Sequence, residues 1–432
     1  MKRQLLVLIA SLTIFKATCV KKDLKPFSSS TLEDALLDFM GLAKKYEYNA
    51  EAHEVTTEDG YILTIFHLYK NVTKDLPVYL EHGIADSADT WIFPGPDKAL
   101  GYLLADEGYD VWCGNARGNK YSRKHVKLNP DKDRTFWAYS FDELGRYDLP
   151  ATIDYIIERT NSKEVRYVGH SEGTTAFYVM LSMKPSYNDK IRIGVSLSPV
   201  AFMSHAASPI FRAASLGEES INAALEALGQ EEIFVMNNAL ATFTVYLCQI
   251  YALYPYCTFT TFLLSGFESK QLAPETVAIE AGHYPVGTSR QTLNHFLENG
   301  RTGRFQRYDF GKRENLKRYD SELPPNYNLT AISAPIALFC GKNDYLSSLI
   351  DVETLRRHLT SVVDFYVVPY DKWTHVDFVW GEDTRVLIAG TRIALAAKRG
   401  SDARLNSRQA TRLPTLCLAT DTRKQLQLAD LH

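Results

Sequence analysis

Hydrophobic residues along this chain fall into two kinds of segment that follow each other in a regular order. Short runs rich in β-branched and aromatic residues predict strands at residues 78–80, 110–113, 165–168, 193–197, 335–340 and 365–368. Longer stretches with helical periodicity predict helices at residues 98–107, 151–159, 174–181, 352–359 and 385–397. Strands that alternate with helices predict an α/β fold, with a mainly parallel sheet covered by helices on both faces.

The alternation is interrupted once, after the strand at 193–197. We expect residues 199–320 to form a mostly helical cap that is inserted into a core made of residues 20–198 and 321–398. Residues 399–432 are rich in Arg, Thr, Ser and Gln and have no periodicity, which predicts a disordered tail or an artefact of the gene model.

The N-terminus has the features of a secretory signal peptide, assigned to residues 1–19. Lys2 and Arg3 form a charged start, and residues 5–15 form an apolar core too short to span a membrane. Cleavage is expected after Cys19. The alternative is a buried N-terminal helix.

The signal predicts a secreted or lysosomal protein that folds in an oxidising compartment. Asn71 and Asn328 lie in N-x-[ST] sequences and are candidate N-glycosylation sites on that route. A net charge of −3, without a basic patch, argues against a nucleic-acid partner.

The candidate chemistry centres on residues 169–173, which read Gly-His-Ser-Glu-Gly. This G-x-S-x-G string lies between a predicted strand and a predicted helix, as a nucleophile elbow requires. Such a turn exposes its central serine, Ser171, above the sheet.

An acid and a histidine follow this serine at the ends of later predicted strands. Asp344 follows the strand at 335–340, and His375 follows the strand at 365–368. A serine hydroxyl needs a base to remove its proton, and a carboxylate orients that base. We therefore predict a catalytic triad of Ser171, His375 and Asp344. The backbone N–H groups of Ile84 and Glu172 are the candidate oxyanion hole, and His82 is expected to have a structural role.

Several segments in the same order resemble the acid lipases, the family of lysosomal acid lipase and gastric lipase. The similar segments are residues 54–63, 81–83, 108–119, 136–143, 147–151, 169–173 and 375–381. The resemblance covers roughly residues 45–395 and implies an α/β-hydrolase fold with a cap and a lid. It also implies a disulfide between Cys248 and Cys257. The family usually has glutamine after the nucleophile, where this chain has Glu172, and an ionised carboxylate there would repel an oxyanion.

The resemblance implies a lipase that hydrolyses triacylglycerols or steryl esters at a lipid–water interface through an acyl-enzyme. No cofactor or metal is expected, because the chain contains no Gly-rich phosphate loop and no metal-spaced Cys/His cluster. The alternatives are a carboxylesterase for small soluble esters and a non-catalytic lipid-binding or storage protein.

Residues 233–267 contain no Asp, Glu, Lys or Arg. The interpretation we favour is a mobile lid that hides an apolar groove from water and opens at a lipid surface. A permanently buried part of the cap and a membrane span remain alternatives. No transmembrane anchor is expected, because a span would bury Asn, Gln and Pro residues in lipid.

Overall fold

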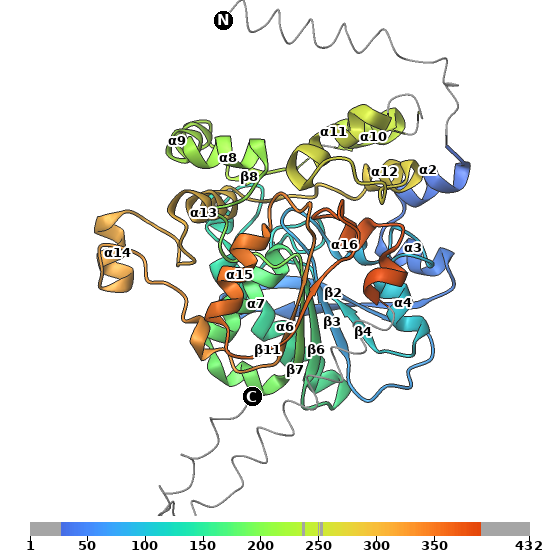
Figure 1. Ribbon diagram of the computed structural model, residues 1–432, viewed down its shortest axis with the longest axis horizontal. Coiled ribbons are helices and arrows are strands. Elements are labelled where there is room, and N and C mark those ends of the chain that lie inside the picture. Colours follow the sequence, from blue (N-terminus) through green and yellow to red (C-terminus); the bar gives the residue numbers. More distant parts are fainter. Residues whose placement is uncertain (1–26, 236–237, 249, 251–253, 390–432) are drawn as a thin grey trace, which may run out of the picture.

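A nine-stranded sheet forms the centre of the protein (Figure 1). The computed structural model describes residues 27–235, 238–248, 250 and 254–389 of the chain. Six adjacent strands pair in parallel. In spatial order they are β4 (Val111–Cys113), β3 (Val78–Glu81), β6 (Val165–His170), β7 (Ile191–Leu197), β10 (Ile336–Cys340) and β11 (Val362–Val367). The predicted, mainly parallel sheet is therefore confirmed.

Three further strands extend one edge of the sheet in antiparallel pairing, and the sequence pattern did not predict them. They are β1 (Asn49–Thr56), β2 (Tyr61–Tyr69) and the short β5 (Lys124–His125). β1 is the outermost strand and most of its side chains are exposed or half-buried. An edge strand of this kind lacks the continuous apolar run that marks a central strand.

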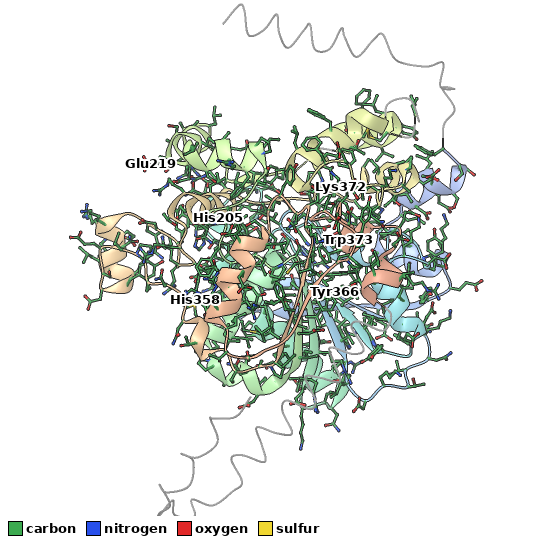
Figure 2. All side chains as sticks on the ribbon, viewed as in Figure 1. His205, Glu219, His358, Tyr366, Lys372 and Trp373 are labelled. Atoms are coloured by element: carbon green, nitrogen blue, oxygen red, sulfur yellow. A yellow bond between two sulfur atoms is a disulfide. The ribbon has the colours of Figure 1, made fainter. Side chains whose placement is uncertain are left out.

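Helices cover both faces of the sheet. Tyr167 of β6 packs in a cluster with residues of α6 (Leu149–Thr160) and α7 (Glu172–Met183). Its neighbour Val168 points to the other face and packs in a second cluster, with residues of α3 (Phe39–Lys45) and α4 (Leu100–Asp106). Helix α15 (Leu349–His358) also contributes to the first cluster. The second contains the fully buried Trp373, labelled in Figure 2. Successive residues of a strand face opposite sides, so each face has its own core.

The chain between β7 and β10 is mostly helical. In Figure 1 most of its helices lie above one end of the strands, and α14 lies at the left. Its elements are α8 (Pro209–Leu216), α9 (Glu218–Ala227), β8 (Glu232–Ile233), α10 (Asn238–Cys248), α11 (Tyr254–Ser265), α12 (Pro274–Glu280), β9 (Thr288–Ser289), α13 (Arg290–Thr302) and α14 (Lys312–Tyr319). The expected bounds of the cap, residues 199–320, stay a prediction.

Helices α10 and α11 make up most of the uncharged segment, and a disulfide between Cys248 and Cys257 joins them. Cys113 and Cys340 are buried free thiols. Among the described residues, none of the helices is long and apolar enough to cross a membrane.

Two of the predicted segments lie outside the described residues. These are the signal peptide at residues 1–19 and the tail at residues 399–432. Of the helix expected at residues 385–397, the structure describes a short helical stretch, Arg385–Ala389.

Candidate active site

Ser171 lies in a sharp turn between β6 and α7. Its backbone angles are φ 51° and ψ −115°, a strained conformation for a residue with a side chain. A Cβ atom on Gly173 would lie 2.5 Å from the carbonyl oxygen of Glu81, and one on Gly169 would lie 2.9 Å from the backbone of Gly173. Both positions therefore require glycine. The turn has the backbone that the G-x-S-x-G string predicts.

The three predicted triad side chains form one continuous chain of hydrogen bonds. Ser171 Oγ lies 2.8 Å from His375 Nε2, and His375 Nδ1 lies 3.0 Å and 3.1 Å from the two carboxylate oxygens of Asp344. All three residues are buried. With its Nδ1 hydrogen directed at Asp344, the imidazole presents the lone pair of Nε2 to the serine hydroxyl.

Asp344 is held in place by three hydrogen-bond donors. Its Oδ1 accepts hydrogen bonds from the backbone N–H groups of Leu346, at 3.0 Å, and Ser347, at 2.7 Å. Its Oδ2 accepts one from the hydroxyl of Ser198, which also lies 2.7 Å from His375 Nδ1.

The sequence analysis did not single out Ser198. It directly follows β7, has φ 55° and is fully buried. The one feature that could have predicted Ser198 is its place directly after β7, because β7 lies between β6 and β10 in the parallel sheet. A residue at the carboxyl end of β7 therefore comes between the serine and the acid.

Two other histidines lie near the triad without occupying the place of the base. His170 Nε2 donates to the carbonyl oxygen of His375 at 2.9 Å, and burial lowers the pKa of His170 to about 3. His82 Nδ1 donates to the carbonyl oxygen of Gly83, while its Nε2 accepts from the backbone N–H of Ala116. Burial lowers the pKa of His82 to about 4. His82 therefore ties two loops together, in agreement with the structural role expected for it.

The two candidate oxyanion donors are the backbone N–H groups of Glu172 and Ile84. Glu172 is the first residue of α7, so its N–H belongs to the positively polarised end of that helix. A Cβ on Gly83 would lie 3.3 Å from the Cβ of Ser171, so the loop that continues into Ile84 passes directly beside the nucleophile. An oxyanion hole requires two donors in such an arrangement.

Comparison with known proteins identifies the family to which this chain belongs. The model for the alpha/beta hydrolase fold matches residues 77–382, and the model for the partial alpha/beta-hydrolase lipase region matches residues 39–95. The chain belongs to the α/β-hydrolase lipase family.

Curated members of the family are similar over most of their length. Lipase 3 of Drosophila melanogaster is 40% identical over 78% of this chain and 87% of its own. Gastric triacylglycerol lipase of Mus musculus is 37% identical over 78% of this chain and 85% of its own. A solved protein of Sulfolobus solfataricus has a TM-score of 0.53 at 13% identity, over 83% of this chain and 94% of its own, and shows the fold alone.

The segment between β7 and β10 is anchored to the loops that carry the triad. The carbonyl oxygen of Ser265, at the end of α11, accepts hydrogen bonds from the backbone N–H groups of Tyr345 and His375. The N–H of Val286 donates to the carbonyl oxygen of Ala85, one residue after Ile84. Hydrogen bonds therefore connect this segment directly to the loops that carry the triad and Ile84.

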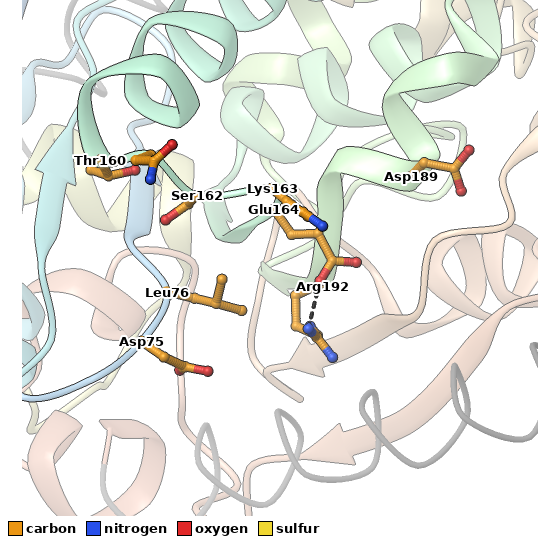
Figure 3. Close-up of a pocket in the computed structure, with 9 residues that line it drawn as sticks. Asp75, Leu76, Thr160, Ser162, Lys163, Glu164, Asp189 and Arg192 are labelled. Carbon is orange, nitrogen blue, oxygen red and sulfur yellow. Dashed lines mark ion pairs between the residues drawn. The ribbon is translucent and has the colours of Figure 1, made fainter.

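A surface pocket of about 510 Å³ lies at the other end of the parallel strands (Figure 3). Leu76 precedes β3, Glu164 precedes β6, and Arg192 lies at the start of β7. Glu164 and Arg192 form an ion pair across it, with 2.6 Å between the charged atoms. Because Ser171, Asp344 and His375 all follow the carboxyl ends of strands, this pocket is separate from the candidate active site.

The carboxyl group of Glu172, which would repel an oxyanion if it were ionised, is held in its neutral form. Its carboxyl group is buried beneath the site, and Oε1 has no hydrogen-bond partner among the described residues. Burial, together with the nearby carboxyls of Glu81 and Asp148, raises the pKa of Glu172 to about 8. The group is therefore neutral at pH 7, so repulsion of an oxyanion begins only at higher pH.

The contacts of Ser198 predict a positioning role. Ser198→Ala removes a hydrogen bond to a charged carboxylate, a contact that contributes about 1.5–3 kcal/mol. We expect kcat to fall roughly 10- to 100-fold with KM unchanged, because the hydroxyl orients Asp344 and His375 and does not contact substrate. Steady-state kinetics measures both constants. Ser182→Ala, a buried serine whose hydroxyl bonds only within α7, is the control. A variant with unchanged kcat contradicts this role.

The raised pKa of Glu172 predicts how Glu172→Gln changes the pH dependence. Below about pH 7 the carboxyl is protonated and resembles the amide, so activities should agree within about twofold. Above pH 8 the wild-type group ionises, and the variant should become several-fold more active than the wild type.

Stability gives a second measurement for the same variant. The folded state holds the Glu172 proton up to about pH 8, while the unfolded chain releases it near its ordinary value. Stability is therefore lost as pH rises through this window. The thermal midpoint of the wild type should fall more between pH 5 and pH 8 than that of Glu172→Gln. Glu219→Gln, on the exposed surface of α9 (Figure 2), is the control. Parallel pH profiles for all three proteins contradict the prediction.

Proposed function

We propose that this protein hydrolyses carboxylic esters of lipids through an acyl-enzyme formed on Ser171. The observation that carries the proposal is the unbroken hydrogen-bond chain from Ser171 Oγ through His375 to Asp344. The backbone N–H groups of Ile84 and Glu172 are the donors we propose for the oxyanion. Family membership supports the same chemistry, because the relatives are named lipases.

Each step of the proposed reaction has a group in place to move its proton. His375 Nε2 removes the proton of Ser171 as Oγ bonds to the ester carbonyl carbon. The N–H groups of Ile84 and Glu172 stabilise the oxyanion, and Asp344 stabilises the imidazolium. The C–O bond then breaks, and the alcohol leaves with the proton from His375. Water, deprotonated by His375, releases the acid and regenerates Ser171.

The composition of the cap segment supports a lipid substrate. Residues 233–267 lack charged side chains, and Phe243, Tyr246 and Phe259 are exposed by 62%, 53% and 56%. Exposed aromatic side chains on an uncharged helical pair suit contact with a lipid–water interface. Gastric triacylglycerol lipase is among the named relatives, and triacylglycerols and steryl esters are the substrates we propose.

The proposed site of action is the secretory route, outside the cell or in the lysosome. The signal peptide predicted at residues 1–19 carries this part of the proposal. Asn71 and Asn328 are both exposed, as N-glycosylation sites must be.

Variants of the triad test the chemistry. Ser171→Ala should remain folded and lose roughly 10⁴-fold or more of the hydrolysis of a soluble p-nitrophenyl ester. An organophosphonate should label the wild type at Ser171, as located by peptide mass spectrometry. Asp344→Asn should be severely impaired, because the carboxylate fixes the tautomer of His375. Asp371→Asn is the control, because Asp371 is an exposed aspartate that pairs with Lys342, two residues before Asp344. An active Ser171→Ala protein, or loss of activity in Asp371→Asn, contradicts the assignment of the catalytic triad.

A charge pair on the cap segment tests the lid. Phe243→Glu combined with Tyr246→Lys should reduce activity on emulsified triacylglycerol at least about tenfold more than activity on a soluble ester, because charges oppose contact with lipid. The wild type should also gain activity sharply once substrate exceeds its solubility limit. The same charges at Val126 and Ile350, which are similarly exposed at 56% and 59%, form the control. Equal losses on both substrates favour a permanently buried part of the cap.

A further inference from the structure

A group of three candidate metal ligands lies on the antiparallel edge strands, away from the triad. Glu51 and His53 belong to β1, and His67 belongs to β2. One ligand atom from each residue lies within 4.8 Å of the other two. It is the one such group of three His, Cys, Asp or Glu side chains in the part of the chain that the structure describes.

Strand pairing brings these residues together. Glu51 pairs directly with His67 across the antiparallel ladder, and His53 lies two residues further along the same face of β1. His67 is in turn paired with Trp112 of β4. Glu51 and His53 lie two residues apart on β1, but His67 lies on the next strand and is distant in sequence, so no spacing rule for metal sites covers all three. This explains why the sequence analysis found no metal-spaced cluster.

His53 offers a nitrogen that has no other partner. Its Nε2 is buried and makes no hydrogen bond to a described residue, while its Nδ1 lies 2.9 Å from the hydroxyl of Tyr155. Glu51 Oε2 lies 3.3 Å from this Nε2. Two ligands bound to one tetrahedral zinc ion at about 2.0–2.1 Å lie roughly 3.4 Å apart. The pair is therefore spaced for a shared ion.

His67 is held by a contact that is typical of metal-bound histidines. Its Nε2 contacts the carboxylate of Asp110, and its ring stacks on Trp112 with 4.3 Å between centroids and 6° between planes. Histidines that bind metal usually donate their other ring N–H to a carboxylate, which fixes the ring and its tautomer. With the Nε2 hydrogen directed at Asp110, the lone pair of the neutral ring lies on Nδ1.

We propose that Glu51, His53 and His67 bind a divalent transition metal, with zinc as the best match. Two imidazoles and one carboxylate suit zinc and disfavour Mg²⁺ and Ca²⁺, which select oxygen ligands. Solvent completes the fourth position, because Glu51 lies at the exposed end of the group. The ion links β1 to β2 and so stabilises the edge strand of the sheet. It takes no part in ester hydrolysis.

Zinc binding to the intact, glycosylated protein tests the proposal. The protein is produced without a polyhistidine tag, stripped with EDTA and titrated with zinc chloride against a chromophoric chelator. We expect one zinc per chain and a rise of a few degrees in thermal midpoint, because a ligand that binds only the folded state stabilises it. Magnesium or calcium chloride should give neither effect. X-ray absorption should show nitrogen and oxygen ligands at about 2.0–2.1 Å.

Variants locate the ion. His53→Gln and Glu51→Gln should each weaken zinc binding at least about tenfold, and Asp110→Asn should weaken it roughly 10- to 100-fold by releasing the His67 ring. Glu51→Gln changes an exposed side chain and so keeps the test valid if His53→Gln does not fold. His358→Gln, at the exposed end of α15 (Figure 2), should bind zinc like the wild type.

Two outcomes overturn the proposal. One is the absence of binding at 1:1 stoichiometry. The other is zinc binding that survives both His53→Gln and Glu51→Gln, which places the ion elsewhere.

Discussion

The crossing of α7 over the parallel sheet is the constraint on which the rest of the site depends. No side chain fits between the start of this helix and the backbone of β3, where a single Cβ on Gly173 would meet Glu81. The approach is so close that the chain must reverse direction within one strained residue, Ser171. The position of the Ser171 hydroxyl, the helix N-terminus beside it and the N–H of Glu172 all result from this one crossing.

The same crossing produces two kinds of carboxyl group around one site. Asp344 lies in a loop, where two backbone N–H groups and a hydroxyl donate to it. Glu81, at the end of β3, and Glu172, at the start of α7, are both buried, and burial raises the pKa of each to about 8. Asp344 is thus the carboxyl group surrounded by donors, whereas the two glutamates with raised pKa values accept fewer hydrogen bonds. Protons held by the enclosed pair favour the folded state in acid.

Some of this architecture was predictable from sequence because it is encoded locally. The strand, glycines and serine of the elbow are consecutive. Asp344 follows a recognisable buried strand, and His375 follows a strand rich in β-branched and aromatic residues. Other features depend on contacts between distant segments. Ser198 acquires its place only when β7 pairs with β10. The neutral state of Glu172 depends on what encloses it, and residue type alone does not specify this.

Strand β1 is a part of the fold that the sequence pattern also failed to predict. Its side chains are largely polar and exposed, so its hydrophobic pattern is weak. Its pairing with β2 extends over eight residue pairs. Hydrogen bonds between backbones hold it in the sheet, and these carry no signature in the identity of the side chains.

The disulfide between Cys248 and Cys257 limits the number of conformations that helices α10 and α11 can adopt. It closes a short loop between α10 and α11, and Ser265 fixes the far end of α11 to the loops of Asp344 and His375. The disulfide and these hydrogen bonds join the two helices to each other and to the triad loops. Such links reduce the number of conformations open to the two helices, so less conformational entropy is lost when they are held in one arrangement.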